Sequence, residues 1–96
     1  MSKITLEEAS GRVRYVRCHT DKVPGPYNMA FAIEELSHGV WEAKIALDAM
    51  AAEDRREFTR VVEEKGDICR IVWTRYPEKG EPYTRETKFN CRCHNA

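Results

Sequence analysis

The feature that most constrains the fold is a period of two in the last third of the chain. Residues 68–76 ("ICRIVWTRY") and 83–93 ("YTRETKFNCRC") alternate between apolar and polar side chains, and residues 77–82 between them ("PEKGEP") contain two prolines and a glycine. Successive side chains of a strand point to opposite faces of a sheet, and proline and glycine are typical of turns. The pattern therefore predicts a β-hairpin with one buried face.

The register of this hairpin follows from matching apolar side chains across its two strands. Matching places Ile71 opposite Phe89 and Cys69 opposite Cys91, with Cys93 on the same buried face. Cysteine without a disulfide partner is among the most frequently buried residue types and packs as a small hydrophobic side chain. We therefore expect these thiols to be reduced and to lie in the core.

A second hairpin is predicted for residues 28–47. Its two halves also alternate, and Ser37-His38-Gly39 fits a three-residue hairpin loop with Gly39 at the left-handed position. Alanine and glutamate favour helix by propensity, so two helices broken at Gly39 are the alternative. The hairpin register pairs Met29 with Leu47, Phe31 with Ile45, Ile33 with Ala43 and Glu34 with Glu42, and it places Trp41 on the apolar face.

The rest of the chain predicts one long helix, one strand and one short helix. Residues 48–66 begin with acidic side chains and end with Lys65 and Gly66, which suits the helix dipole and a glycine C-cap. Residues 12–20 are rich in β-branched and aromatic side chains and predict a strand. Residues 5–11 ("TLEEASG") show the capping-box spacing of a helix start and a glycine stop.

These elements define the expected fold class, which is α+β. We expect an antiparallel sheet of about five strands, made of two hairpins and an N-terminal strand, with the long helix packed on one face. A length of 96 residues corresponds to a single domain, residues 1–96.

The apolar residues are too dispersed for a membrane protein. No stretch approaches the ~20 consecutive apolar residues that a transmembrane helix needs, and the first ten residues lack the apolar core of a signal peptide. The sequence therefore predicts a cytoplasmic protein with no membrane partner. Thiols stay reduced in that compartment, which agrees with cysteines buried in the core.

A structural zinc site is the alternative interpretation of the cysteines. Cys18, Cys91, Cys93 and His94 would supply the four ligands that tetrahedral zinc requires. However, the C-x-C spacing differs from the usual C-x-x-C, and adjacent residues of a strand point to opposite faces. The main prediction is therefore no metal and no cofactor.

Signatures of catalysis are missing from the sequence. It contains no G-x-S-x-G, no phosphate-binding glycine loop and no H-E-x-x-H motif. His19, His38 and His94 fall in a predicted strand, a turn and the C-terminal segment, and none is placed on the same face as a neighbouring nucleophile. We predict that the protein is not an enzyme and has no catalytic residues.

Charge is balanced over the whole chain but segregated along it. Residues 11–22 carry four basic and one acidic side chain (+3) and residues 68–96 carry six and three (+3), whereas residues 23–67 carry five and ten (−5). If the first strand lies near the last hairpin, their basic side chains form a patch beside exposed tyrosines. The predicted partner-binding residues are Arg12, Arg14, Arg70, Arg75, Lys88, Arg92, Tyr76 and Tyr83.

These observations predict a non-catalytic binding protein that docks on a protein partner and modulates or inhibits it. Arginine and tyrosine are enriched at the centres of protein interfaces. Small accessory proteins encoded by phages or plasmids share this size and this lack of catalytic motifs, and a second copy of the chain is a further candidate partner. The alternatives are a nucleic-acid-binding module that uses the basic face and a zinc-stabilised small domain.

Overall fold

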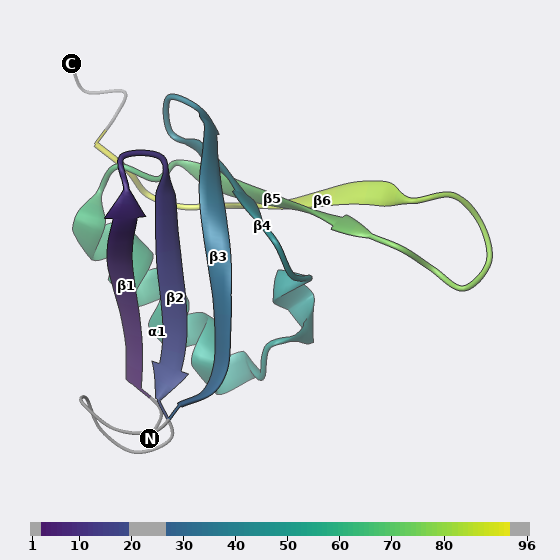
Figure 1. Ribbon diagram of the computed structural model, residues 1–96, viewed down its shortest axis with the longest axis horizontal. Coiled ribbons are helices and arrows are strands. Elements are labelled where there is room, and N and C mark those ends of the chain that lie inside the picture. Colours follow the sequence, from purple (N-terminus) through teal and green to yellow (C-terminus); the bar gives the residue numbers. More distant parts are fainter. Residues whose placement is uncertain (1–2, 20–26, 93–96) are drawn as a thin grey trace.

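The computed structural model describes residues 3–19 and 27–92. In this part of the chain one α-helix packs against a six-stranded sheet, which confirms the α+β class (Figure 1). The strands are β1 (Lys3–Ser10), β2 (Val13–His19), β3 (Tyr27–Ser37), β4 (Val40–Ala43), β5 (Arg70–Arg75) and β6 (Tyr83–Lys88), and the helices are the 3₁₀ helix η1 (Leu47–Ala49) and α1 (Ala52–Lys65).

The strands lie in the sheet in the order in which they occur along the chain. All neighbouring pairs are antiparallel except β4 and β5, which are parallel and are connected through η1 and α1. The prediction of a wholly antiparallel sheet of about five strands is therefore close to the observed fold, but the sheet has six strands and one parallel pair. The reason is the connection through α1, since a helical crossover returns the chain to the end of the sheet from which it started.

The prediction of a short helix over residues 5–11 is wrong, because this segment belongs to β1 and the turn after it. Ile4 lies opposite Cys18 and Leu6 opposite Val16, so the apolar side chains of β1 continue the buried face of β2. The burial of this alternating pattern outweighs a local capping signal.

The hairpin prediction for residues 28–47 is confirmed over its central part. Ile33 lies opposite Ala43, and Gly39 has the predicted left-handed φ, at 78°. The loop is one residue shorter than predicted, because Ser37 still belongs to β3 and pairs with Val40, which leaves His38 and Gly39 in the turn. β4 ends at Ala43, so the outer pairs Phe31–Ile45 and Met29–Leu47 do not form and Leu47 belongs to η1 instead.

Glu34 and Glu42 are opposite each other, as the register predicted. Lys44 offsets their repulsion, because its ammonium lies 3.4 Å from the carboxylate of Glu34 and 2.7 Å from that of Glu42. The backbone N–H of Lys44 also donates to the carbonyl of Ala32, which holds the chain beside β3 for one residue beyond β4.

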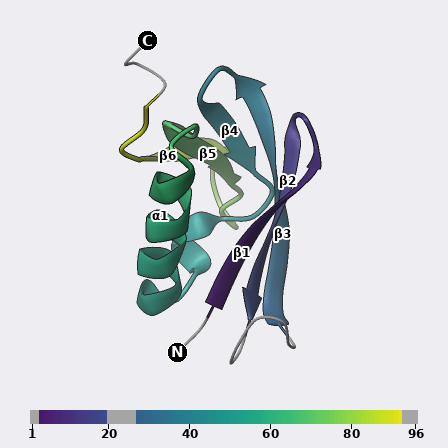
Figure 2. The same ribbon diagram turned by 90° about the vertical axis from the view of Figure 1, so that its left-hand side faces the viewer.

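α1 covers the face of the sheet formed by β1–β3 (Figure 2). It begins four residues later than the predicted range 48–66 and ends at Lys65, followed by Gly66 as the C-cap with a φ of 77°. Phe58 contacts Phe31 and Phe89 edge to face, with ring centroids 5.9 and 6.1 Å apart. The buried apolar side chains of the core are Ile4, Val16, Cys18, Phe31, Ile33, Trp41, Ala43, Leu47, Met50, Phe58, Val62, Ile68, Ile71, Trp73 and Phe89.

The last hairpin forms with a register shifted by two residues from the predicted one. Ile71 lies opposite Thr87, and the N–H of Phe89 donates to the carbonyl of Cys69. A shift of two residues leaves each side chain on its predicted face, whereas a shift of one would have turned every side chain over. The buried positions of Ile71, Trp73 and Phe89 were therefore predicted correctly although their partners were not.

Candidate interaction surface

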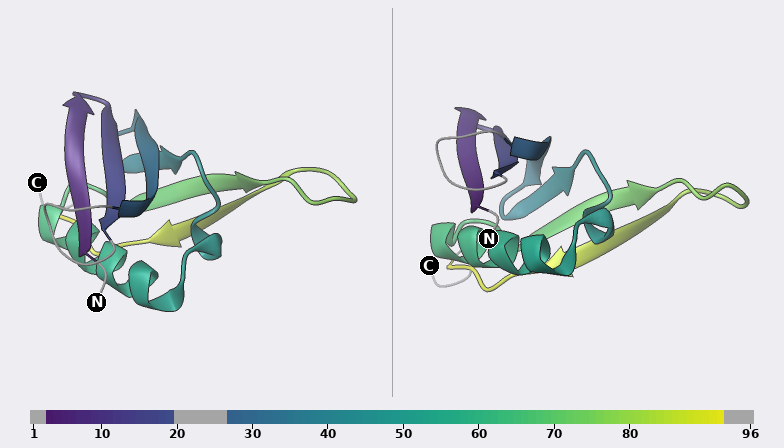
Figure 3. Two further views of the ribbon diagram at one scale, coloured as in Figure 1. Left: turned by 60° about the horizontal axis from the view of Figure 1, so that its bottom comes forward. Right: turned by 90° about the horizontal axis from the view of Figure 1, so that it is seen from below.

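The outer part of the β5–β6 hairpin, residues 74–85, extends beyond the rest of the molecule (Figure 1 and Figure 3). We call this segment the arm. Every residue from Tyr76 to Arg85 is exposed; Tyr76 is 78% exposed and Tyr83 is 46% exposed. The arm therefore presents two aromatic side chains to solvent with little support from the core.

Two arginines flank Tyr83 at the base of the arm. Arg75 lies directly opposite Tyr83, and Arg85 is two residues further along the same strand face. Both guanidinium groups approach one carboxylate, that of Asp48 in η1, at 2.9 Å from Arg75 and 3.8 Å from Arg85. Two cations share a single anion here, so this face of the arm keeps a net positive charge.

Arg70 and Lys88 lie opposite each other on the outer face of the same hairpin, as expected for a basic patch. The Arg70 guanidinium, however, forms a 3.0 Å ion pair with Glu86. Glu42 lies opposite Val72, and Val72 opposite Glu86, so carboxylates occupy the same face. The outer face of the sheet is therefore mixed in charge rather than uniformly basic.

Arg14 does not lie on the solvent-facing side where the sequence placed it. Its side chain shares the covered face of β2 with Val16 and Cys18, and the residue is only 7% exposed. The guanidinium lies over the ring of Trp41, 4.4 Å from the ring centre, and donates two hydrogen bonds to Asp67, one of them at 3.0 Å.

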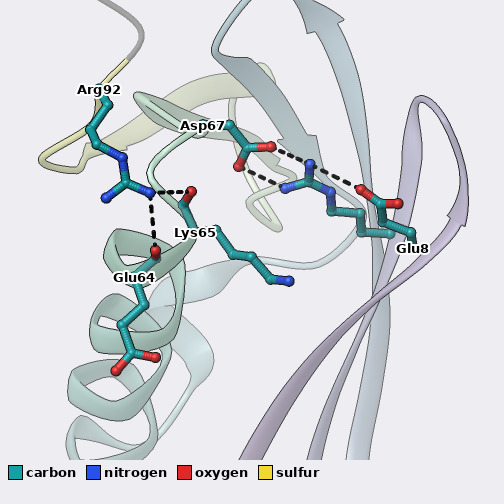
Figure 4. Close-up of polar contacts among 6 residues, drawn as sticks. Glu8, Glu64, Lys65, Asp67 and Arg92 are labelled. Carbon is teal, nitrogen blue, oxygen red and sulfur yellow. Dashed lines mark hydrogen bonds and ion pairs between the residues drawn. The ribbon is translucent and has the colours of Figure 1, made fainter.

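The ion pair with Arg14 shifts the titration of Asp67. Hydrogen bonds and charge from Arg14 lower the pKa of the Asp67 carboxyl group, and the same bonds raise the pKa of Arg14. Glu8 also approaches this guanidinium, at 3.6 Å (Figure 4). The position of Arg14 makes it a structural residue that connects the sheet to the end of α1.

Arg92 closes the C-terminal end of α1. Its guanidinium donates to the carbonyls of Glu64 at 3.3 Å and Lys65 at 2.9 Å, and its backbone N–H donates to the carbonyl of Gly66 at 2.7 Å (Figure 4). The last turn of a helix leaves its carbonyl groups without partners inside the helix, and a cation there also interacts favourably with the helix dipole. Arg92 therefore caps the helix instead of extending the patch.

The structure thus separates the predicted partner-binding residues into groups. Arg75, Tyr76 and Tyr83 come together on the arm, and Arg70 and Lys88 lie on the same hairpin nearer the core. Arg12 lies in the turn between β1 and β2, and Arg14 and Arg92 make the structural contacts described above. Sequence reasoning missed Arg85 and Asp48. Arg85 could have been found from its two-residue spacing to Tyr83, whereas Asp48 is brought there only by the fold.

The expectation of reduced cysteines is wrong for Cys69 and Cys91, which form a disulfide with 5.1 Å between their Cα atoms. The two-residue register shift moves Cys91 past the paired part of the hairpin, where the chain turns toward the end of α1. Cys18 is a free thiol in the core, and burial raises its pKa.

The zinc alternative loses one of its ligands in this arrangement. Cys91 is bonded to Cys69 and therefore has no free thiolate, while Cys93 and His94 lie outside the described residues. Residues 3–19 and 27–92 contain no group of three histidine, cysteine or carboxylate side chains placed to hold a metal ion.

A cleft of about 520 Å³ opens where β4 and β5 separate. One wall consists of residues 42–46, at the end of β4, and the other of residues 74–76, at the end of β5. We call this cleft the fork. It lies at the base of the arm, so Thr74, Arg75 and Tyr76 belong to both features.

Comparisons with protein-family models, with curated proteins and with solved structures find no match to this chain. Among the residues that the structure describes, no helix combines the length and the apolar character needed to cross a bilayer. The candidate function therefore rests on the geometry and chemistry of the chain itself.

Proposed function

We propose that this chain is a non-catalytic binding protein that docks on a protein partner through its arm and modulates or inhibits that partner. The observation that carries the proposal is the exposure of Tyr76 and Tyr83 on a hairpin that extends away from the core (Figure 3). Exposed tyrosines give large contact areas at a low entropic cost, because only two side-chain torsions are ordered on binding.

The arginines beside Tyr83 support a protein partner. Arg75 and Arg85 share the carboxylate of Asp48, so their side chains are partly oriented before a partner arrives. A preordered guanidinium loses less conformational freedom on binding and can bond a carboxylate of the partner through two N–H groups. Tyrosine and arginine together are the residue types in which interface binding energy concentrates.

The arm also supports a second candidate function, the binding of a nucleic acid. Arg75, Lys79 and Arg85 could contact phosphates while a tyrosine stacks on a base. Glu78 and Glu81 at the tip and Asp48 at the base oppose this function, because they reduce the positive potential that phosphate binding needs. A protein partner is therefore the leading proposal.

The compartment remains part of the proposal. A cytoplasmic location was expected from the sequence, whereas the Cys69–Cys91 disulfide is more typical of an oxidising compartment. Binding should therefore be measured both with and without a thiol reductant.

The test is a pull-down from an extract of the cells that naturally express the protein, treated with nuclease. Tyr83→Ala should reduce recovery of the partner at least tenfold, as expected for a residue at an interface centre. Tyr15→Ala is the matched control, because Tyr15 is 43% exposed on β2, away from the arm, and its loss should leave recovery unchanged.

The outcomes separate the two candidate functions. Recovery that survives nuclease and depends on Tyr83 supports docking on a protein, and a changed activity of that protein on addition of the chain supports modulation. Recovery that disappears on nuclease treatment and falls steeply with salt supports the nucleic-acid function. Equal losses in the Tyr83 and Tyr15 variants would contradict a role for the arm.

A further inference from the structure

We infer that the fork between β4 and β5 is a binding site for an extended segment of the partner protein, which adds to the sheet as a strand along the inner edge of β5. This inference rests on the proposed function and names its mode of recognition. In such strand addition, backbone hydrogen bonds hold the peptide and pockets for alternate side chains select its sequence.

The first observation is that the pairing of β4 with β5 stops early. The parallel register joins Val40 to Arg70, Trp41 to Ile71 and Glu42 to Val72, and it does not continue along β5, which runs to Arg75. Continued pairing would join the carbonyl of Ala43 to the N–H of Thr74, and the carbonyl of Thr74 to the N–H of Ile45. Neither bond occurs in the described part of the chain.

The second observation is the direction of these backbone groups. Cys69 and Phe89 form a hydrogen-bonded pair, so by alternation the backbone groups of Ile71, Trp73 and Arg75 point toward β6. Those of Thr74 consequently point away from β6, into the fork. Lys44 bonds toward β3, which turns the backbone groups of Ala43 and Ile45 toward the fork as well.

The two walls are held apart by their other contacts. The Lys44 backbone remains bonded to Ala32, and its side chain is bound by Glu34 and Glu42, before the chain bends into η1. β5 meanwhile stays paired with β6 as far as Arg75 opposite Tyr83. The fork is therefore an opening between two walls that each have other partners, and its volume of about 520 Å³ lies within the usual range of ligand pockets, roughly 300–1,000 Å³.

The chemistry of the walls defines the occupant. Groups that offer both N–H donors and carbonyl acceptors at strand spacing match another polypeptide backbone in extended conformation. On the core side the fork is bounded by Ile45, which packs against the core, and on the outer side by Lys44 and Tyr76. The occupant should therefore carry a β-branched or other apolar residue toward Ile45 and polar residues on its other face.

Thr74 and Thr84 offer a matched pair of variants, because they lie opposite each other in the hairpin. Neither takes part in the β5–β6 hydrogen bonds, so proline at either position leaves that ladder intact. The N–H of Thr74 faces the fork, whereas that of Thr84 faces the open outer edge of β6. Thr74→Pro thus removes a donor from the fork alone, and Thr84→Pro removes a donor from the other edge.

The experiment uses a library of random linear peptides displayed on phage, selected against the full chain. Enriched peptides are synthesised, and their binding is measured by titration and by amide hydrogen exchange. We expect slowed exchange at Thr74 and Ile45, and about two- to tenfold weaker binding to Thr74→Pro, which is the range that corresponds to the loss of one backbone hydrogen bond. Thr84→Pro should bind as the unaltered chain does. Ile45→Ala keeps the backbone N–H groups of Thr74 and Thr84 but loses the apolar side chain of the fork, so it should bind more weakly than the unaltered chain.

Three results would overturn the inference: no enriched peptide, protection confined to Thr84, Glu86 and Lys88 on the outer edge of β6, or equal binding by Thr74→Pro and Thr84→Pro. The pull-down distinguishes this failure from failure of the proposed function. Recovery that depends on Tyr83 but is unaffected by Thr74→Pro keeps docking through the arm and rejects the fork.

Discussion

The guanidinium of Arg14 donates hydrogen bonds to both carboxylate oxygens of Asp67, which lies 53 residues further along the chain. Arg14 is almost fully buried, and its guanidinium lies over the ring of Trp41. A buried cation is tolerated only when its charge is compensated, so this contact connects β2, β4 and the residues that follow α1.

Removal of the Asp67 charge should therefore destabilise the fold. We expect Asp67→Asn to lower the free energy of unfolding by about 1–3 kcal/mol, less than for a fully buried pair because the Asp67 side chain is 50% exposed. The measurement is denaturant unfolding followed by circular dichroism. Glu8→Gln is the control, since Glu8 lies 3.6 Å from the guanidinium and is 70% exposed; its effect should stay below about 0.5 kcal/mol.

The same contact predicts a dependence of stability on pH. Arg14 lowers the pKa of Asp67 in the folded chain below its unfolded value of about 3.9. The resulting stabilisation is fully present above the unfolded pKa and is lost as the pH falls through the folded pKa. The stability difference between the unaltered chain and Asp67→Asn should hold from neutral pH down to about pH 5 and shrink below about pH 4. A difference that stays constant down to about pH 2 would contradict this assignment.

The Cys69–Cys91 disulfide should contribute measurably to stability. It closes a loop with a sequence separation of 22 residues, for which the loss of unfolded-state entropy corresponds to about 3 kcal/mol. Addition of a reductant should therefore lower the melting temperature of the unaltered chain. The double variant Cys69→Ser/Cys91→Ser should melt at the lower temperature with or without reductant, and a reductant effect that persists in this variant would point to a different bond.

Alanine substitutions at Gly66 and Gly80 should distinguish the cost of backbone strain from the cost of a steric overlap. Both glycines have positive φ, at 77° and 97°, but an added Cβ atom at Gly66 would overlap the Arg92 guanidinium, whereas at Gly80 it would meet nothing within 4 Å. Gly80→Ala should cost about 1 kcal/mol through its conformation alone. Gly66→Ala should cost more, because it also displaces Arg92 from the helix carbonyls.

Thermal melting of both glycine variants checks this prediction. Combining Gly66→Ala with Arg92→Ala should give less than the sum of the two single losses, since both changes remove the same cap. Additive losses would show that Arg92 adjusts to the new methyl group without leaving the helix end.

Much of the fold follows from local patterns. The C-terminal end of α1 was predictable because Lys65 and Gly66 suit the negative end of a helix and a left-handed residue there. The hairpin at Gly39 was predictable because alternation and a glycine turn agreed. In the last hairpin the buried faces of Ile71 and Trp73 were predictable from alternation, since that pattern depends only on the period of a strand.

The candidate surface was only partly predictable. Tyr76 and Tyr83 could be placed near a proline-rich turn from the sequence, and they lie on the arm. The role of Arg14 was not predicted, because its charge suggested a solvent-facing position, whereas Asp67, 53 residues further along the chain, compensates that charge in a buried one. The fork could not be predicted at all, since it depends on where β4 leaves the sheet.

What the sequence determined by itself is therefore the kind of each main element and the side that each strand buries, because these depend on neighbouring residues and a repeat of two or 3.6 positions. Tertiary structure alone decided the register of the β5–β6 hairpin, the strand conformation of the first segment, the parallel contact of β4 with β5 and the pairing of Cys69 with Cys91. Each of these depends on contacts between residues far apart in the chain. Such contacts are selected by the packing of the whole core, which a local pattern does not contain.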